Sequence, residues 1–158
     1  MSIRVGFGFD VHQLKIGHPF YLGGVLLDHS SGAFGHSDAD VLIHAICDAM
    51  LGAANLRDIG YHFSDKDEQF RGISSLLLLE RVRVLIQEKG WKVANMDTSI
   101  CLEAPKIQAH VPRMQILIAK AAGVDPEAVS IKATTNEQMG FIGRQEGLTA
   151  YAVVLLEK

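Results

Sequence analysis

The sequence predicts a single α/β (α+β) domain, in which a mixed β-sheet carries three main helices on one face. The chain has 158 residues, of which 48% are hydrophobic, enough for one domain with its own core. Apolar strand patterns alternate with longer helical patterns along its whole length. It contains no internal repeat, low-complexity tract or linker, so we expect one domain over residues 1–158.

The first predicted strand covers Ile3 to Phe9, a short apolar run with glycines that is typical of a buried strand. Residues two apart on a strand share a face, so Asp10 and His12 at its end should point the same way. A carboxylate oxygen and an imidazole nitrogen are good zinc ligands, but zinc takes three or four of them. The alternative is a turn aspartate beside a solvated histidine.

A helix is predicted in the stretch from His36 to Gly52. Ser37 or Asp38 can act as its N-cap, the interior is rich in Ala, Leu and Ile, and Gly52 can end it.

This helix would place His36, Asp40 and His44 on one stripe, at positions i, i+4 and i+8. His44 would then complete a metal-binding tripod with Asp10 and His12, and Asp40 would orient its imidazole. Substrate or water would take the fourth position. The alternative is a core helix in which His44 is simply paired with Asp40.

Two segments around this helix are predicted from their turn residues. Gly23-Gly24 joins a hairpin of strands Pro19–Leu22 and Val25–Leu27. The polar stretch from Asn55 to Asp67 is predicted as a loop, and loops of this size are often functional, although a solvated connection is the alternative.

The second half alternates helices and strands. A helix over Ser74–Lys89 has a core stripe, and Leu77 and Val84 add apolar surface beside it, some of which could face another subunit. The remaining predicted elements are a strand at Trp91–Leu102, a helix at Val111–Gly123 with Pro112 in its first turn, and strands at Val129–Ala133 and Gly147–Leu156.

Charge and cysteine content limit the class of protein. The net charge is −3 and no Lys/Arg run occurs, so a nucleic-acid polymer is not an expected partner, whereas a phosphorylated small molecule is compatible. Cys47 and Cys101 lack Cys-x-x-Cys spacing and are predicted to be reduced thiols. No leader or membrane-length apolar run is present, so we expect a soluble cytoplasmic protein without a membrane partner.

Three polar stretches follow predicted strands, where α/β sheets usually place ligands. In Glu103–Ile107, Lys106 offers an ammonium to an anion, or is simply solvated. Lys132–Glu137 has hydroxyls and a carboxylate suited to a phosphate with Mg²⁺ or Mn²⁺; an ordinary turn is the alternative. Gly140–Arg144 is predicted as a flexible loop without P-loop or Rossmann spacing.

Five of these motifs together resemble one family nearly end to end, the 2-C-methyl-D-erythritol 2,4-cyclodiphosphate synthases of the non-mevalonate isoprenoid pathway. They are Gly8-Phe9-Asp10-Val11-His12, His36-Ser37-Asp38-Ala39-Asp40-Val41, Asp58-Ile59-Gly60, Ala104-Pro105-Lys106, and Lys132-Ala133-Thr134-Thr135 followed by Gly-Phe-x-Gly-Arg-x-Glu-Gly at 140–147. Asn136 stands where Thr is expected, Gln145 where Gly is common, and Ala109 where Pro is common. These departures affect details of the phosphate and base pockets.

The resemblance implies two metal ions and a cyclisation. A divalent ion, usually zinc, would be held by Asp10, His12 and His44, and Mg²⁺ or Mn²⁺ by Glu137. The substrate, 4-diphosphocytidyl-2-C-methyl-D-erythritol 2-phosphate, would close on itself and release CMP.

The resemblance also implies the roles of individual residues. His36 and Thr135 would stabilise the transition state, and Ser37 with free helix N–H groups would hold phosphate. The implied substrate-binding residues are Asp10, His12, His36, Ser37, Asp58, Ile59, Gly60, Phe63, Asp65, Leu102, Ala104, Pro105, Lys106, Ile107, Gln108, Thr134, Thr135, Asn136, Glu137, Phe141 and Arg144.

The implied assembly is a homotrimer with active sites between subunits. One subunit would offer the metal tripod and Asp58, and its neighbour Lys106, Thr135 and Glu137. Two alternative functions belong to other classes of protein. One is a zinc phosphodiesterase, which would release a linear product, and the other is a non-catalytic nucleotide-binding trimer stabilised by bound metal.

Overall fold

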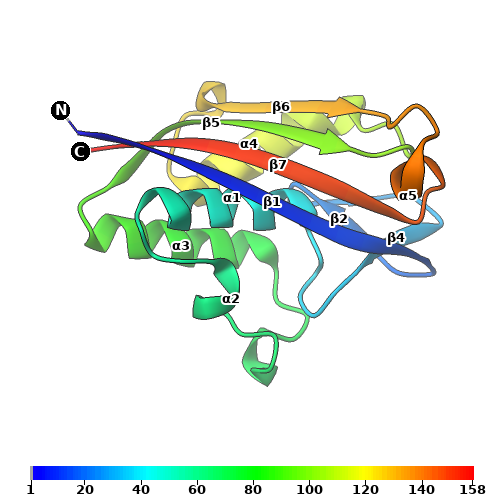
Figure 1. The fold of residues 1–158 in the computed structure, drawn as a ribbon, viewed down its shortest axis with the longest axis horizontal. Coiled ribbons are helices and arrows are strands. Elements are labelled where there is room, and N and C mark those ends of the chain that lie inside the picture. Colours follow the sequence, from blue (N-terminus) through cyan, green and yellow to red (C-terminus); the bar gives the residue numbers. More distant parts are fainter. Residues whose placement is uncertain (1) are drawn as a thin grey trace.

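A five-stranded mixed sheet in the order β4-β1-β7-β5-β6 forms the centre of the molecule. The structure, a computed structural model, describes residues 2–158 (Figure 1). Strands β5 and β6 are parallel, and the other neighbours are antiparallel. The strands are β1 (Ile3–Ile16), β2 (Phe20–Leu22), β3 (Val25–Leu27), β4 (Ser31–Phe34), β5 (Lys92–Cys101), β6 (Val129–Thr134) and β7 (Gly147–Glu157), with β2 and β3 in a separate hairpin.

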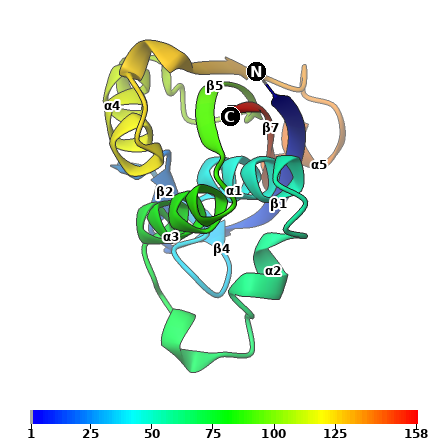
Figure 2. The same cartoon turned by 90° about the vertical axis from the view of Figure 1, so that its left-hand side faces the viewer.

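The three long helices lie on the same side of this sheet (Figure 2). They are α1 (Val41–Ala53), α3 (Ser75–Glu88) and α4 (Val111–Ala122). The shorter ones are α2 (Ile59–His62), α5 (Gly140–Gly143) and the 3₁₀ turns η1 (Glu68–Phe70), η2 (Gln108–His110) and η3 (Pro126–Ala128). The predicted α+β class, with a mixed sheet and three main helices on one face, is confirmed.

Helix α1 packs unusually close to β1 because two glycines of that strand face it. A Cβ on Gly6 would lie 1.8 Å from the carbonyl oxygen of Ala49, and one on Gly8 would lie 1.9 Å from that of Ala45. Any larger residue would push the helix away from the strand. Asp10 and His12 have the same strand parity as Gly6 and Gly8, so they lie on the helix-facing side of β1.

The opposite face of the sheet is apolar and exposed in the single chain. Val5 is 66% exposed and Phe7 64%, and Phe9 packs on Tyr151 of β7 with ring centroids 5.2 Å apart. The prediction that β1 is buried is therefore wrong for this face. An apolar run has the same composition whether it faces a protein core or an outer surface of the subunit.

The first long helix begins later than predicted. Its N-cap is Asp40, whose carboxylate accepts from Ile43 N, and its first residue is Val41. Ala39 has a φ of 57°, so a right-handed helix cannot run through it from His36. The predicted stripe of His36, Asp40 and His44 does not exist.

Four further features differ from the predictions. Strand β1 continues to Ile16 through registered pairing with β7 and then β4, and β4 itself was not predicted. Helix α2 lies inside the stretch predicted as a loop, and residues 140–143 form a helical turn instead of a flexible loop. The predicted helices at Ser74 and Val111 begin within one residue of those positions.

Buried Asp40 ties the β2–β3 turn to the start of α1. Its carboxylate accepts from Gly23 N at 3.0 Å and Gly24 N at 2.7 Å, besides Ile43 N at 3.1 Å. Burial raises the pKa of Asp40, while these N–H donors lower it, and the net direction is upward.

The two ends of the described chain lie together, away from α5 (Figure 1). Lys158 N donates to Ser2 O at 3.0 Å, and the cationic groups of Arg4 and Lys158 both lie over the Trp91 ring. Within residues 2–158, no helix combines the length and apolar character needed to cross a membrane.

We predict that Gly8→Ala destabilises the protein by about 1–3 kcal/mol, because the new methyl group forces α1 off the strand. Gly52→Ala, in the last turn of α1, is the matched control: a Cβ there meets nothing within 4 Å, so the change should not destabilise and should stabilise by at most about 1 kcal/mol. Urea unfolding at equal protein concentration measures both. Equal stability of Gly8→Ala and wild type would contradict the close-packing argument.

Candidate functional site

Three potential metal-ligand atoms form a compact triangle between β1 and α1. Asp10 Oδ2 lies 3.0 Å from His12 Nε2 and 3.1 Å from His44 Nδ1, and the two nitrogens are 3.2 Å apart. The three side chains are 26%, 16% and 14% exposed, respectively. The predicted tripod is thus brought together as a group that could hold a divalent cation.

The outer nitrogens of both imidazoles are already engaged. His12 Nδ1 donates to the carbonyl oxygen of Phe34 at 3.1 Å. His44 Nε2 lies 2.9 Å from Ser75 Oγ, and Ser75 in turn donates to Asp38. Because the Ser75 hydroxyl proton is used on Asp38, the His44 Nε2–H must be the donor in that pair. The remaining lone pairs, on His12 Nε2 and His44 Nδ1, then face the centre of the triangle, as metal ligands require.

The electrostatics favour an anionic Asp10. Burial alone would raise its pKa, but when the inner nitrogens of His12 and His44 carry protons, which a bound cation would displace, their hydrogen bonds and charge lower the pKa to about 2. For His44, burial lowers the pKa, whereas the contact with Asp10 raises it, and the net direction is upward. Both pKa shifts arise because one carboxylate and two imidazoles lie close together. One carboxylate oxygen and two imidazole nitrogens are also a donor set that fits a divalent cation.

The residues expected at the start of the first helix have other roles. Asp38 accepts from Ser75 N at 2.8 Å and so caps α3, not α1. Asp40 does not orient His44, contrary to the prediction, because its carboxylate is used on backbone N–H groups. Ser37 lies in a loop with its Oγ 3.1 Å from His44 Nε2. It therefore cannot hold phosphate as part of a helix N-terminus.

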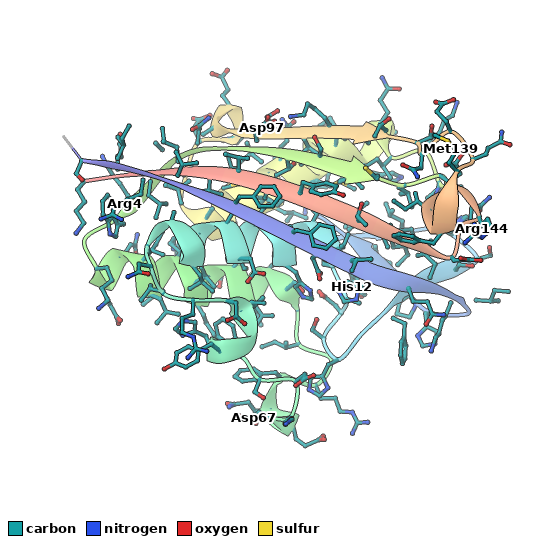
Figure 3. All side chains as sticks on the ribbon, in the orientation of Figure 1. Arg4, His12, Asp67, Asp97, Met139 and Arg144 are labelled. Atoms are coloured by element: carbon teal, nitrogen blue, oxygen red, sulfur yellow. The ribbon has the colours of Figure 1, made fainter. Side chains whose placement is uncertain are left out.

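His36 lies in the loop between β4 and α1, and its Nε2 is 3.4 Å from the carbonyl oxygen of Asp67. Figure 3 shows Asp67 in the segment that hangs below the sheet, and His12 on β1 above it. The segment from α2 through η1 forms the wall of a cleft opposite His12 and His44.

The cleft beside the tripod has a volume of about 370 Å³ and is half open to solvent. It collects eight of the expected site residues, which are His12, His36, Ser37, His44, Ile59, Gly60, Phe63 and Asp65. The apolar side chains of Phe70, Ile73 and Leu78 complete its wall, and sequence reasoning did not select these because they match an ordinary core pattern.

A second cleft, of about 600 Å³, lies at the carboxyl ends of β5 and β6. Seven expected residues line it: Leu102, Pro105, Lys106, Ile107, Gln108, Thr134 and Thr135. Five further residues line it: Glu103, Val111, Pro112, Ile131 and Ala133. Glu103 and Ala133 belong to polar stretches already selected from the sequence, whereas Val111, Pro112 and Ile131 are apolar residues of α4 and β6 to which sequence reasoning assigned only structural roles.

Seven other expected residues line neither cleft, namely Asp10, Asp58, Ala104, Asn136, Glu137, Phe141 and Arg144. The Asn136 side chain donates to Met139 O at 2.8 Å, which gives this departure from the family pattern a role in shaping the loop. Glu137 accepts from Thr135 Oγ1 at 3.2 Å, and Arg144 forms two bonds with Glu146 at 2.9 and 3.1 Å. Figure 3 shows Met139 and Arg144 together at the α5 end.

The comparisons with known proteins agree with this arrangement. The sequence model of the YgbB family matches residues 3–157. The chain belongs to the YgbB family. Two relatives named 2-C-methyl-D-erythritol 2,4-cyclodiphosphate synthase come from Cytophaga hutchinsonii and Bacteroides thetaiotaomicron, at 57% and 58% identity over 158 residues. In both cases 100% of this chain and 99% of the relative are covered.

Solved structures of YgbB-type proteins share the fold. IspF from Plasmodium falciparum, in a CDP complex, matches with a TM-score of 0.86 and 30% identity over 98% of this chain and 96% of its own. The bifunctional IspDF from Campylobacter jejuni matches with a TM-score of 0.94 and 39% identity over 98% of this chain. This chain spans 42% of the length of that longer protein.

We predict that His44→Ala in this YgbB-family chain lowers divalent-metal affinity by more than about 100-fold. Removing a residue that only hydrogen-bonds to a metal ligand typically costs about 10–100-fold in affinity, and removing the ligand itself should cost more. The fold should persist, since alanine is the best helix former. The zinc content of the protein after incubation with zinc, measured by plasma emission, checks this prediction. Circular dichroism checks that the variant is folded. His110→Ala, outside the cluster, is the control. Stoichiometric zinc in folded His44→Ala would refute the ligand assignment.

Proposed function

We propose that this chain is a divalent-metal-dependent cyclodiphosphate synthase, a phosphorus–oxygen lyase of isoprenoid precursor biosynthesis. It would convert 4-diphosphocytidyl-2-C-methyl-D-erythritol 2-phosphate to 2-C-methyl-D-erythritol 2,4-cyclodiphosphate and CMP. The observation that carries the proposal is the Asp10/His12/His44 triangle beside an open cleft, in a chain 57% identical end to end to a protein named as this synthase.

The reaction balances without water. An oxygen of the substrate's 2-phosphate forms a bond to the β-phosphorus, and the bond from that phosphorus to the oxygen of the departing CMP breaks. Both groups are anionic, so the barrier falls mainly through positioning and charge neutralisation, with little covalent work for the protein. The protein has a net charge of −3, so positive charge must be supplied locally.

A divalent cation on Asp10, His12 and His44, with Mg²⁺ or Mn²⁺ near Glu137, would neutralise phosphate charge and hold phosphate oxygens. His36 and Ser37 line the cleft beside the triangle, where they can donate hydrogen bonds to a phosphate. We propose that His36 and Thr135 stabilise the transition state.

The cytidine end would occupy the 600 Å³ cleft. Its mostly apolar walls suit a pyrimidine ring, and Lys106 supplies a cation for the diphosphate. The Plasmodium falciparum structure is described as a CDP complex, which supports a cytidine nucleotide for this fold. Asp58 and Gly60 would contact the ribose, Ala104 and Asn136 would frame the nucleotide, and Phe141 and Arg144 would line the rest of the cavity.

The active unit would be a homotrimer with sites between subunits. The helices cover one face of the sheet, and the other presents Val5, Phe7, Phe9 and Tyr151 to solvent in a single chain. A stripe of this kind is typical of an interface. The metal-ligand side and the nucleotide side occupy two separate clefts of one chain, so a ring could join one subunit's tripod to its neighbour's Lys106 and Thr135.

Incubation of the protein with the proposed substrate, zinc and Mg²⁺ should yield CMP and the cyclic diphosphate, read by mass spectrometry. In oxygen-labelled water neither product should carry the label. Labelled, linear product would instead indicate a phosphodiesterase. Binding of CDP with no turnover would indicate a non-catalytic nucleotide-binding module, and both results would overturn the proposal.

Site sharing makes a second prediction. His44→Ala and Lys106→Ala proteins, each inactive alone, should regain part of wild-type activity when they are unfolded and refolded together, because some interfaces pair an intact tripod with an intact nucleotide cleft. Native mass spectrometry checks that mixed trimers form. Mixed trimers without activity would place the whole site within one subunit.

A further inference from the structure

Asp48 contacts the cleft wall from the helix that carries His44. It lies one turn after His44 on α1, and its Oδ1 accepts a hydrogen bond from Ile59 N at 2.7 Å. Ile59 is the first residue of α2, and the N-cap of that turn, Asp58, makes no side-chain capping bond of its own. Asp48 therefore provides a side-chain acceptor at the start of α2, which Asp58 does not provide.

The segment that Asp48 holds has few other polar links to the body of the protein. Residues 57–69 of the described chain make two hydrogen bonds to more distant parts of the protein. One is the Asp48–Ile59 bond, and the other, from His36 Nε2 to Asp67 O, is longer at 3.4 Å. The remaining hydrogen bonds of residues 57–69 have partners within residues 55–73. Ile59 and Phe63 also pack against the core, but apolar packing alone does not fix the orientation of a backbone.

We propose that Asp48 is a positioning residue that fixes the Asp58–Gly60 backbone relative to the metal-ligand triangle. Because α1 carries both His44 and Asp48, one rigid helix sets the distance between the triangle and the wall of the cleft. The inference rests on the proposed function, in which Asp58 and Gly60 contact the substrate's ribose.

The role requires a hydrogen-bond acceptor and does not require a charge. Burial raises the pKa of Asp48, the hydrogen bond from Ile59 N lowers it, and the carboxylates of Asp58 and Asp10 raise it, so that the net direction is upward. The amide oxygen of an asparagine can accept the same bond from Ile59 N. Asparagine should therefore substitute for Asp48, whereas alanine or leucine should not.

The test compares Asp48→Asn with Asp48→Ala and Asp48→Leu, the last of which keeps the branched shape of the side chain but removes the acceptor. With the proposed substrate, the alanine and leucine variants should raise KM about 10-fold and change kcat little, since a misplaced binding wall weakens contacts made before the chemical step. The asparagine variant should stay close to wild type. Asp125→Ala, which removes a similar cap in η3, is the control and should change neither constant.

Hydrogen exchange at the Ile59 amide gives a readout that needs no turnover. Protection should fall in the alanine and leucine variants and persist in Asp48→Asn. A wild-type protein that makes no CMP would refute the proposed function, while the exchange data would still report on the anchor. Unchanged protection and KM in both acceptor-free variants, or an asparagine variant as impaired as alanine, would overturn the role of Asp48.

Discussion

The close approach of α1 to β1 is the constraint on which the rest of the structure depends. Two strand glycines leave room for the helix backbone itself, so the carbonyl groups of Ala45 and Ala49 pack directly on the strand. His44 is thereby held within hydrogen-bonding distance of Asp10 and His12. A side chain of ordinary size at Gly6 or Gly8 would widen this gap and open the triangle, because a helix moves as a rigid body.

The polar network around the triangle extends this rigidity outward. His44 is linked through Ser75 to Asp38, and Asp38 caps the first N–H of α3, so the imidazole is held by the start of a second helix. Asp40 anchors the hairpin turn in the same region with three backbone donors. Satisfied buried networks of this kind specify one geometry, since any displacement leaves a buried group unpaired.

The sequence predicted the parts of the site that follow from local periodicity. Strand alternation placed Asp10 beside His12, and helical spacing from Asp40 selected His44, although the part of that stripe before Asp40 does not exist. Ser75 lies 31 residues from His44, and no sequence spacing predicts a bond across that distance. The late start of α1 was not predicted, because an alanine in the sequence does not indicate that its backbone adopts the left-handed conformation, as Ala39 does. The exposed face of β1 was missed because apolar residues suit a core and an interface equally.

The two ends of the sheet have different freedom to change. The two ends of the described chain meet beside Trp91, where Ser2 and Lys158 are joined by a backbone hydrogen bond, while α5 lies at the other end of the sheet (Figure 1) and neither cleft is lined by these three residues. A polypeptide attached at this end would begin away from both clefts. The bifunctional IspDF from Campylobacter jejuni, of which the matching region makes up 42%, shows that this fold also occurs within a longer chain.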